Sequence, residues 1–230
     1  MRSRPLNNRV AIIIPAYNEE PRISRVLDAA TRCNLADEIV VVCDGSTDHT
    51  AEVASLYAKV KVVDLKTNIG KGGAMSMGVA NCSCGVICFV DADLQGLRPE
   101  HFERIITPVL LNKCDMAIGV FRGGTFLSDS AQRISPYLSG QRCLRREFFE
   151  SIPYLAEIRF GVEVTLNTFA RRQKIRVARV VLHGLSNNLK ERKLGLVKGT
   201  AARAKMYAEI GRAMVRIRRR TTKKRPKRAR

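Results

Sequence analysis

Two carboxylates spaced one residue apart follow an apolar stretch near the middle of the sequence. Residues 86–90 read VICFV, Asp91 and Asp93 come directly after them, and the side-chain amide of Gln95 follows two residues later. Hard cations such as Mg²⁺ and Mn²⁺ prefer oxygen ligands, and Mg²⁺ is commonly held by one or two carboxylates together with substrate phosphates. A pair of solvated acids at the start of a helix is the alternative interpretation, and the short motif alone leaves both open.

A glycine-rich segment, TNIGKGGAMSMG at residues 67–78, places Lys71 just before a stretch with helical character. Glycines permit close approach of the backbone to a ligand, a helix N-terminus favours phosphate, and a lysine adds a positive point charge. The spacing matches neither the P-loop nor the dinucleotide-binding fingerprint. Such a turn alone is more often structural, but combined with a metal site it predicts a ligand that contains a diphosphate.

Both segments adjoin stretches that read as buried β-strands. Apolar, β-branched runs recur along the first half of the chain, with helical patterns between them, at residues 10–14, 38–43, 60–63, 86–90 and 116–119. This alternation predicts an α/β fold with a mostly parallel central sheet, whose ligands bind at the carboxyl ends of the strands. The polar clusters of the sequence fall at those ends: Pro15 to Glu19, Asp44 to Ser46, Asp91 to Asp93, and Arg122. Residues 139–153 read as a loop leading into a short helix, and residues 176–182 as a further strand.

Four segments carry a resemblance to a known family. IIIPAYNEE, VVCDGSTDHT, NIGKGGA and FVDADLQG, in this order and spacing, resemble the nucleotide-binding half of family 2 glycosyltransferases of the GT-A fold. They are most similar to the dolichyl-phosphate mannose or glucose synthases and to glucosyl-3-phosphoglycerate-synthase-like enzymes. The resemblance covers residues 8–122 strongly and residues 123–195 more weakly. It implies a Rossmann-like sheet flanked by helices in a domain over residues 1–195, with a nucleotide-sugar half (8–122) and an acceptor half (123–195).

The resemblance also implies roles for the residues that match the family's motifs. Those expected to bind the nucleotide sugar are Pro15, Ala16, Tyr17, Glu19, Asp44, Lys71 and Asp91. Asp91, Asp93 and Gln95 are expected to hold Mg²⁺ or Mn²⁺, and the match at Gln95 favours the polyprenyl-phosphate branch. Asp93, Arg122 and Arg142 are expected to act in the transfer, since Arg122 and the segment Ser139-Gly140-Gln141-Arg142 resemble segments near the sugar and the acceptor.

Some positions depart from the family pattern. Cys43 stands where many relatives have a second acid, so contacts with the base are expected to differ. No clear catalytic base is evident. Glu163 is a candidate, although an acid on the outer face of a helix is the favoured interpretation, and a phosphate acceptor is already ionised and needs no strong base. His183 lies near a position where some relatives place a metal-binding histidine, but a lone histidine there is more often not a ligand.

These observations predict a metal-dependent glycosyltransferase that moves a hexose from a nucleotide-sugar donor to a phosphate-bearing acceptor, with polyprenyl phosphate favoured. A glycosyltransferase with a small soluble acceptor is one alternative. A sugar nucleotidyltransferase is another, although its glycine-rich signature would follow the first strand, where this chain has PAYNEE. The seven cysteines show no zinc-type spacing and are expected to be reduced thiols.

The strong positive charge of the chain is concentrated at its end. The formal net charge is +20, and residues 212–230 contain eleven Lys or Arg and no acid. We expect residues 196–230 to form a basic amphipathic helical tail, with residues 206–230 either solvated or attached to anionic lipid. Nucleic-acid binding is the least favoured partner, since no recognition module is visible. No secretory signal or membrane-spanning run is evident, so the expected location is cytoplasmic, with attachment at the cytoplasmic membrane face as the alternative.

Overall fold

The computed structural model describes residues 5–122, 139–159 and 161–187 of the chain. Its strands and 3-10 turns are η1 (Leu6–Asn8), β1 (Val10–Ala16), β2 (Glu38–Asp44), β3 (Val60–Leu65), β4 (Val86–Phe89), β5 (Leu94–Gln95), β6 (Met116–Arg122), β7 (Arg142–Arg145), η3 (Leu155–Glu157), β8 (Val177–His183) and β9 (Ser186–Asn187). The helices are α1 (Glu20–Ala30), α2 (Thr50–Ser55), α3 (Lys71–Ala80), α4 (Pro99–Leu110), α6 (Arg146–Glu150) and α7 (Val162–Arg172). The predicted basic tail lies outside the described residues.

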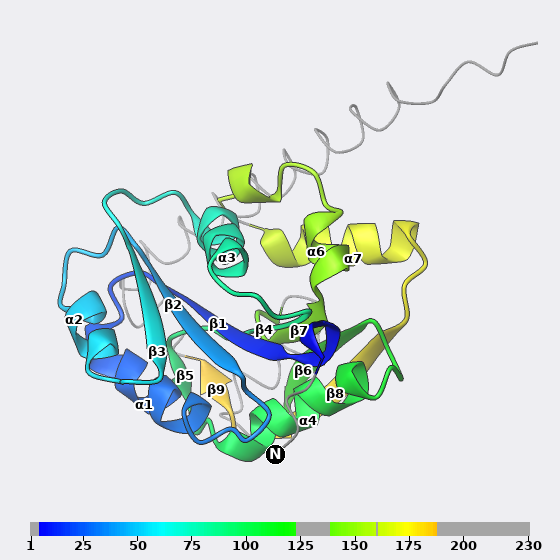
Figure 1. The fold of residues 1–230 in the computed structure, drawn as a ribbon, viewed down its shortest axis with the longest axis horizontal. Helices are drawn as coiled ribbons and strands as arrows, with labels where there is room; N and C mark the ends of the chain where they lie inside the picture. The colour runs from blue at the N-terminus through cyan, green and yellow to red at the C-terminus, as the bar shows by residue number, and fades with distance from the viewer. Residues whose placement is uncertain (1–4, 123–138, 160, 188–230) are drawn as a thin grey trace, which may run out of the picture.

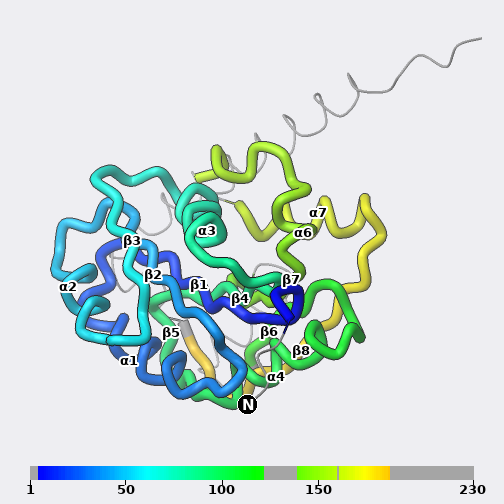
Figure 2. Tube along the Cα trace, in the orientation of Figure 1, coloured from blue at the N-terminus to red at the C-terminus, as the bar shows by residue number. Residues whose placement is uncertain are grey.

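Seven strands form the central sheet in the order β3-β2-β1-β4-β7-β6-β8. All neighbouring pairs are parallel except those of β7, which runs antiparallel to both β4 and β6. The short strands β5 and β9 make a separate antiparallel pair. In Figure 2 the labels place β3 and β8 at opposite edges of the sheet. The predicted mostly parallel sheet is confirmed, whereas the expected loop at residues 139–153 contains the additional strand β7.

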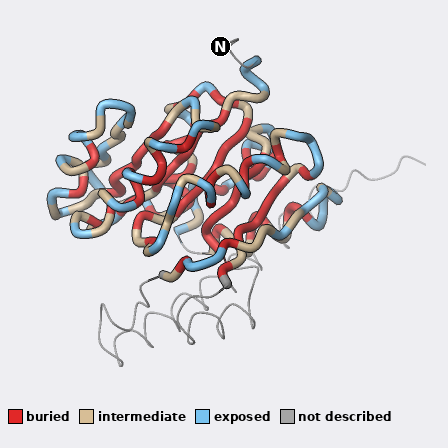
Figure 3. The backbone as a smooth tube through the Cα atoms, turned by 90° about the horizontal axis from the view of Figure 1, so that it is seen from below, coloured by how far each residue is buried: buried red, intermediate tan, exposed pale blue. Residues whose placement is uncertain are grey.

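Helices cover both faces of the sheet (Figure 1). On one face α1, α2 and α4 pack over a cluster that includes Val10, Ile12 and Ile14. On the other face α3, α6 and α7 pack over a cluster that includes Ala11 and Ile13. Successive side chains of β1 therefore enter opposite layers, which explains why its sequence is apolar without alternation. Burial of each of these isoleucines contributes roughly 1.5–3 kcal/mol to the free energy of folding. In Figure 3 the buried backbone, in red, runs through the middle of the molecule.

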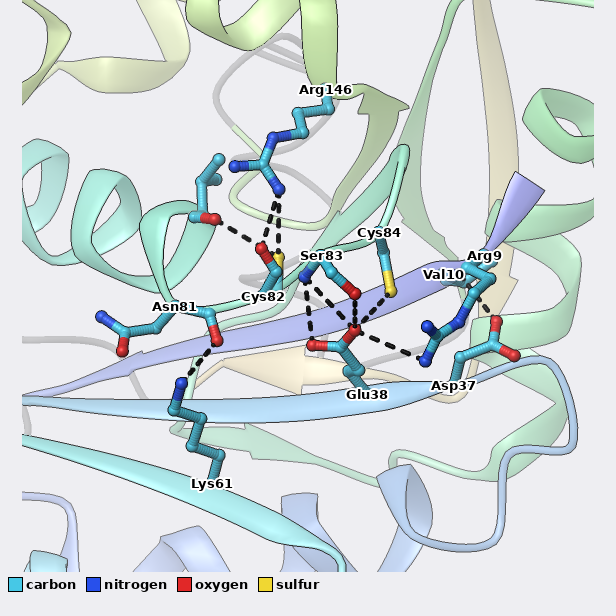
Figure 4. A network of polar contacts seen from close by, with 11 residues as sticks. Arg9, Val10, Asp37, Glu38, Lys61, Asn81, Cys82, Ser83, Cys84 and Arg146 are labelled. Carbon is cyan, nitrogen blue, oxygen red and sulfur yellow. Dashed lines mark hydrogen bonds and ion pairs between the residues drawn. The ribbon is translucent and has the colours of Figure 1, made fainter. Parts of the chain in front are cut away.

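A polar network ties together the amino ends of β1, β2 and β4, at the end of the sheet opposite the predicted site (Figure 4). The carboxylate of Glu38 accepts hydrogen bonds from the backbone and hydroxyl of Ser83 and from the thiol of Cys84, and it pairs with Arg9 at 3.5 Å. Burial alone would raise the pKa of Glu38, but the hydrogen bonds from Ser83 and Cys84 outweigh it and hold the pKa below its ordinary value of 4.5. The network has a structural role, because its bonds join the beginning of β2 to the residues just before β1 and β4.

Replacing Glu38 by Gln is expected to lower the free energy of unfolding by about 1–2 kcal/mol at pH 7, because charge-assisted hydrogen bonds are lost. A carboxyl whose folded pKa is depressed contributes its stability above the unfolded pKa, and that contribution disappears as the pH falls through the folded pKa. Urea unfolding of wild type and Glu38→Gln should therefore differ at pH 7 and converge below pH 4.5. Glu52→Gln, at a side chain that is 69% exposed, is the control with little expected effect. An equal loss at both pH values would contradict the assigned role of the Glu38 charge.

Candidate active site

The carboxyl ends of β1, β2 and β4 meet at one edge of the sheet. These three strands are adjacent and parallel, with Ala16 opposite Cys43 and Ile13 opposite Phe89. The polar residues that follow each strand must therefore lie on one rim, as the sequence predicts. Helix α3 begins with Lys71 at the same rim, since the side chain of Lys71 contacts Asp91 directly after β4.

Lys71 lies between two carboxylates from opposite halves of the chain. Its Nζ donates to Oδ1 of Asp91 at 2.7 Å and to Oε1 of Glu163 at 2.6 Å. The side chains are 32%, 22% and 16% exposed, respectively. Burial alone would lower the pKa of Lys71, but the two carboxylates outweigh it and raise the pKa. Burial would raise the pKa of Glu163, and the Lys71 charge instead holds it below its ordinary value, so Lys71 and Glu163 are both charged at neutral pH.

A second set of contacts fixes the other oxygen of Asp91. Nε2 of Gln141 donates to Oδ2 of Asp91 at 2.8 Å, and the hydroxyl of Ser139 donates to Oε1 of Gln141 at 2.8 Å. Between them, Gly140 lies so close to Asp91 that a Cβ at this position would overlap both carboxylate oxygens. A residue with a Cβ at position 140 would therefore have to displace the Asp91 carboxylate from its present position.

Arg142 supports this segment from inside the protein. It is 1% exposed, its Nε donates to the carbonyl of Ser139 at 2.9 Å, and one terminal nitrogen donates to Oδ1 of Asn167 at 2.8 Å. Burial lowers the pKa of Arg142 to about 10, and the nearby charges of Glu163 and Asp91 partly oppose this. The guanidinium remains charged at neutral pH. The structure therefore places the predicted catalytic Arg142 beneath the rim, where it positions Ser139 and Gln141.

The segment after β1 is joined to the segment after β2. The backbone amide of Glu19 donates to the hydroxyl of Thr50, and the carboxylate of Glu19 pairs with Arg22 at 2.8 Å. Glu19 is 9% exposed, whereas Tyr17 is 50% exposed. Pro15 and Ala16 are the last two residues of β1. The nucleoside contact predicted for these four residues stays a prediction, and Tyr17 presents the largest accessible surface among them.

Asp44 anchors the loop that leads into α3. It is 4% exposed, and its two carboxylate oxygens accept the backbone amides of Ile69 and Gly70 at 2.7 and 2.9 Å. Gly70 has a φ of +89°, a conformation that favours glycine. The contact with a base or ribose that the resemblance assigns to Asp44 stays a prediction, but the structure shows a local task for this carboxylate, which is to shape the turn before Lys71.

The glycines around Lys71 differ from the expected phosphate cradle. The amides of Lys71 and Gly72 donate to the carbonyls of Arg159 and Ile158 at 3.3 and 2.9 Å. A Cβ at Gly70 would meet Arg159, and one at Gly72 would meet the carbonyl of Ile158. The expectation that this helix start offers its amides to phosphate is therefore wrong: the glycines let the segment around η3 pack onto α3, and the side chain of Lys71 is what reaches the rim.

Asp93 lies in the turn that follows Asp91, and Gln95 comes two residues later in β5. Both are half-buried, and Gln95 lies in β5 opposite Ser186. Among the residues that the structure describes, no three His, Cys, Asp or Glu side chains converge into a ready-made metal cluster. The donors of this chain would be the carboxylates of Asp91 and Asp93 and the amide oxygen of Gln95, an all-oxygen set that fits Mg²⁺ or Mn²⁺ completed by ligand phosphates.

Arg122 and His183 end two neighbouring strands. Arg122 is the last residue of β6, and it lies opposite His183 in the parallel register with β8. His183 is exposed. The roles predicted for Arg122 in the transfer and for His183 in metal binding stay predictions.

The seven cysteines are all free and buried, as expected.

Glu163 is the residue whose position the sequence interpretation missed. It was expected on the outer face of a helix, and instead it contacts Lys71 across 92 residues of sequence. One signal was present: Glu163 and Asn167 are four residues apart on α7, so they share one face of the helix. Asn167 binds Arg142, and this polar face of α7 therefore contacts the site at both Lys71 and Arg142.

A family comparison identifies the architecture around this rim. The model of glycosyl transferase family 2 matches residues 11–171, a stretch that runs from β1 into α7 and contains Lys71, Asp91, Gln141 and Glu163. The chain belongs to glycosyl transferase family 2. The four segments in which the resemblance was found all lie within the matched stretch.

Individual relatives of this family 2 chain differ in their acceptors. Dolichyl-phosphate beta-glucosyltransferase of Drosophila melanogaster is 39% identical over 107 residues, which are 40% of this chain and 33% of that protein. The 4,4'-diaponeurosporenoate glycosyltransferase of Staphylococcus aureus strain USA300 is 39% identical over 102 residues, 42% of this chain and 27% of that protein. The chain therefore matches about a third or less of the length of these curated relatives.

A solved structure matches this chain over most of its length. It is glucosyl-3-phosphoglycerate synthase from Mycobacterium tuberculosis in complex with Mn²⁺, uridine-diphosphate-glucose and phosphoglyceric acid. The sequence identity is 26%, the TM-score is 0.66, and the match covers 88% of this chain and 80% of that one. The central sheet and its flanking helices are thus the GT-A-type fold that the sequence predicts.

Proposed function

We propose that this protein is a metal-dependent glycosyltransferase that moves a hexose from a nucleotide-sugar donor to a phosphate-bearing acceptor. The observation that carries the proposal is the meeting of Lys71, Asp91 and Glu163 at the carboxyl edge of the parallel sheet. This edge is where ligands of open α/β sheets bind. Membership of family 2 supports sugar transfer over nucleotidyl transfer. No feature of the described residues specifically favours the nucleotidyltransferase alternative.

The residues at this edge of the sheet would have different roles in the reaction. Asp91, Asp93 and Gln95 would hold Mg²⁺ or Mn²⁺, which when bound offsets the negative charge that builds on the leaving diphosphate. Lys71 would supply a positive charge and hydrogen-bond donors to the diphosphate. Gln141 keeps Asp91 in place through its 2.8 Å hydrogen bond, so the carboxylate need not reorganise during the reaction.

Glu163 indicates how the site could treat different acceptors. Its depressed pKa keeps it ionised at neutral pH and makes it a weak base toward a hydroxyl acceptor. A phosphate acceptor arrives as an anion and loses no proton. Of the two relatives discussed above whose acceptors bear phosphate, one is named for dolichyl phosphate and the other holds phosphoglyceric acid in its structure. These two names support a phosphate-bearing acceptor here.

The acceptor is tested by incubating the protein with Mn²⁺, labelled UDP-glucose or GDP-mannose, and one acceptor at a time: polyprenyl phosphate, phosphoglyceric acid, or an apolar carboxylic acid. We expect a labelled product with at least one phosphate-bearing acceptor, and with polyprenyl phosphate in preference to phosphoglyceric acid. A product formed with the carboxylic acid alone would contradict the phosphate acceptor and leave the glycosyltransferase assignment intact. A product with phosphoglyceric acid alone would favour the alternative of a small soluble acceptor.

The membrane association of the protein stays a prediction. The basic segment 206–230 lies outside the described residues, and within the described ranges no helix is both long enough and apolar enough to cross a bilayer. A peripheral location at the cytoplasmic face of a membrane is what we propose, because a lipid-linked acceptor would have to be met there and the basic segment suits anionic lipid.

A further inference from the structure

We propose that the ammonium of Lys71 acts as a resident counter-ion on Asp91, and that it makes the rim take up a divalent cation together with a diphosphate rather than alone. The inference rests on the proposed function, because it concerns the same metal and nucleotide. It assigns Lys71 a second task, which is to set the order of loading, beyond its contact with the diphosphate.

The contacts of Asp91 show what a free cation would have to displace. Oδ1 is bonded to Nζ of Lys71 at 2.7 Å, and Oδ2 accepts Nε2 of Gln141 at 2.8 Å. The Asp91 side chain is only 22% exposed. Each oxygen keeps a further lone pair, but a cation that approaches Oδ1 meets the positive charge of the ammonium already bonded there. The two cations repel each other unless the ammonium moves to another anion.

Glu163 allows Lys71 to leave Asp91 while it keeps one carboxylate partner. It binds the same Nζ at 2.6 Å, so Lys71 keeps one carboxylate when it leaves Asp91. A diphosphate offers oxygens that can accept the remaining donors of the ammonium, which carries three. Lys71 can thus move its second contact from Asp91 to phosphate without losing a charge partner. Without a diphosphate, no such replacement anion is brought to the site.

Charge balance points in the same direction. Asp91 and Glu163 are two carboxylates that share one ammonium. If the ammonium is removed, the two carboxylates lose the cation that they share and repel each other more strongly, which is costly for partly buried groups. A divalent cation would relieve this repulsion, so a chain without the Lys71 charge should bind the free cation more tightly than the wild type does.

The test measures Mn²⁺ uptake from the electron paramagnetic resonance signal of free Mn²⁺, with and without UDP and with no turnover. For wild type we expect weak uptake of Mn²⁺ alone and a strong increase when UDP is added. For Lys71→Met we expect Mn²⁺ alone to bind about tenfold more tightly, and UDP to increase this affinity much less. Because coupling between two ligands is reciprocal, Mn²⁺ should also tighten UDP binding less in this variant.

Two further variants control the interpretation. Lys71→Gln keeps a hydrogen-bond donor without the charge, and it should change Mn²⁺ binding in the same direction even if Lys71→Met folds poorly. Lys61→Met removes a lysine that binds the carbonyl of Asn81 away from the rim, and it should behave as wild type. Thermal melts followed by circular dichroism confirm that each variant is folded.

The possible results separate this inference from the proposed function. If both folded Lys71 variants bind Mn²⁺ alone no more tightly than wild type, the counter-ion role is wrong while the metal site stands. If wild type binds Mn²⁺ equally well with and without UDP, the loading order is wrong. If wild type takes up neither Mn²⁺ nor UDP under any condition, and GDP in place of UDP gives the same result, the proposed function fails and the inference fails with it.

Discussion

Replacing Asp91 by Ala is expected to reduce sugar transfer by roughly 10³-fold or more, because a carboxylate that anchors the cation at the leaving diphosphate is lost. The fold should survive. Asp91 lies after β4 at the rim, outside the apolar clusters that hold the sheet, so its removal opens no cavity in the core. Initial transfer rates with saturating donor, measured alongside thermal melts, check both parts of the expectation.

Asp28→Ala is the matched control for this prediction. Asp28 is an exposed acid on α1 that accepts a hydrogen bond from the hydroxyl of Tyr57, and in the described part of the chain no hydrogen bond or ion pair joins it to Lys71, Gln141 or Glu163. Its variant should retain wild-type transfer while losing the same formal charge. If Asp91→Ala kept near-wild-type activity while folded, the assignment of Asp91 to the cation and diphosphate would be wrong.

Gly140→Ala is expected to reduce transfer by roughly 10²-fold or more, although it adds a single methyl group, since small misplacements of catalytic groups are this costly. The added carbon would overlap both oxygens of the Asp91 carboxylate. Gly140 is absent from the residues with positive φ, so its backbone conformation is open to alanine and the effect arises from contact with Asp91. Single-turnover assays on the folded variant measure the loss.

A double-mutant cycle shows whether Gly140 acts through Asp91. If the methyl group lowers the transfer rate by displacing this carboxylate, Asp91→Ala has already removed the group that would be displaced. Adding Gly140→Ala to Asp91→Ala should then lower the transfer rate little further. Coupling of this kind is expected for residues in direct contact. Fully multiplicative losses in the double variant would instead indicate that Gly140 matters for another part of the segment 139–142.

The first half of the fold follows directly from its sequence. β1, β2 and β4 are continuous apolar runs because both of their faces are buried, and this pattern is distinctive. β7 was not predicted because RCLR is short and carries two arginines. It is a strand only because β4 and β6 flank it and because Ser139 and Asn167 satisfy the buried guanidinium of Arg142.

The site could be predicted in part for similar reasons. Asp91 and Lys71 follow strand and turn signals that local sequence reveals. Glu163 could not be placed, because the periodicity of α7 shows which side is apolar but does not show that the polar edge meets Lys71 from 92 residues away. The glycines around Lys71 were misassigned because close packing against η3 and a phosphate cradle require the same residue type.

Binding of nucleotide sugars to the purified chain tests the central claim most directly. Isothermal titration of a panel that includes UDP-glucose and GDP-mannose should be done with Mn²⁺, with EDTA, and with the Asp91→Ala variant. The account predicts saturable binding of at least one nucleotide sugar that requires the cation and is lost in the variant. A panel without any binding in the presence of Mn²⁺, or binding that is unchanged by both EDTA and Asp91→Ala, would contradict it.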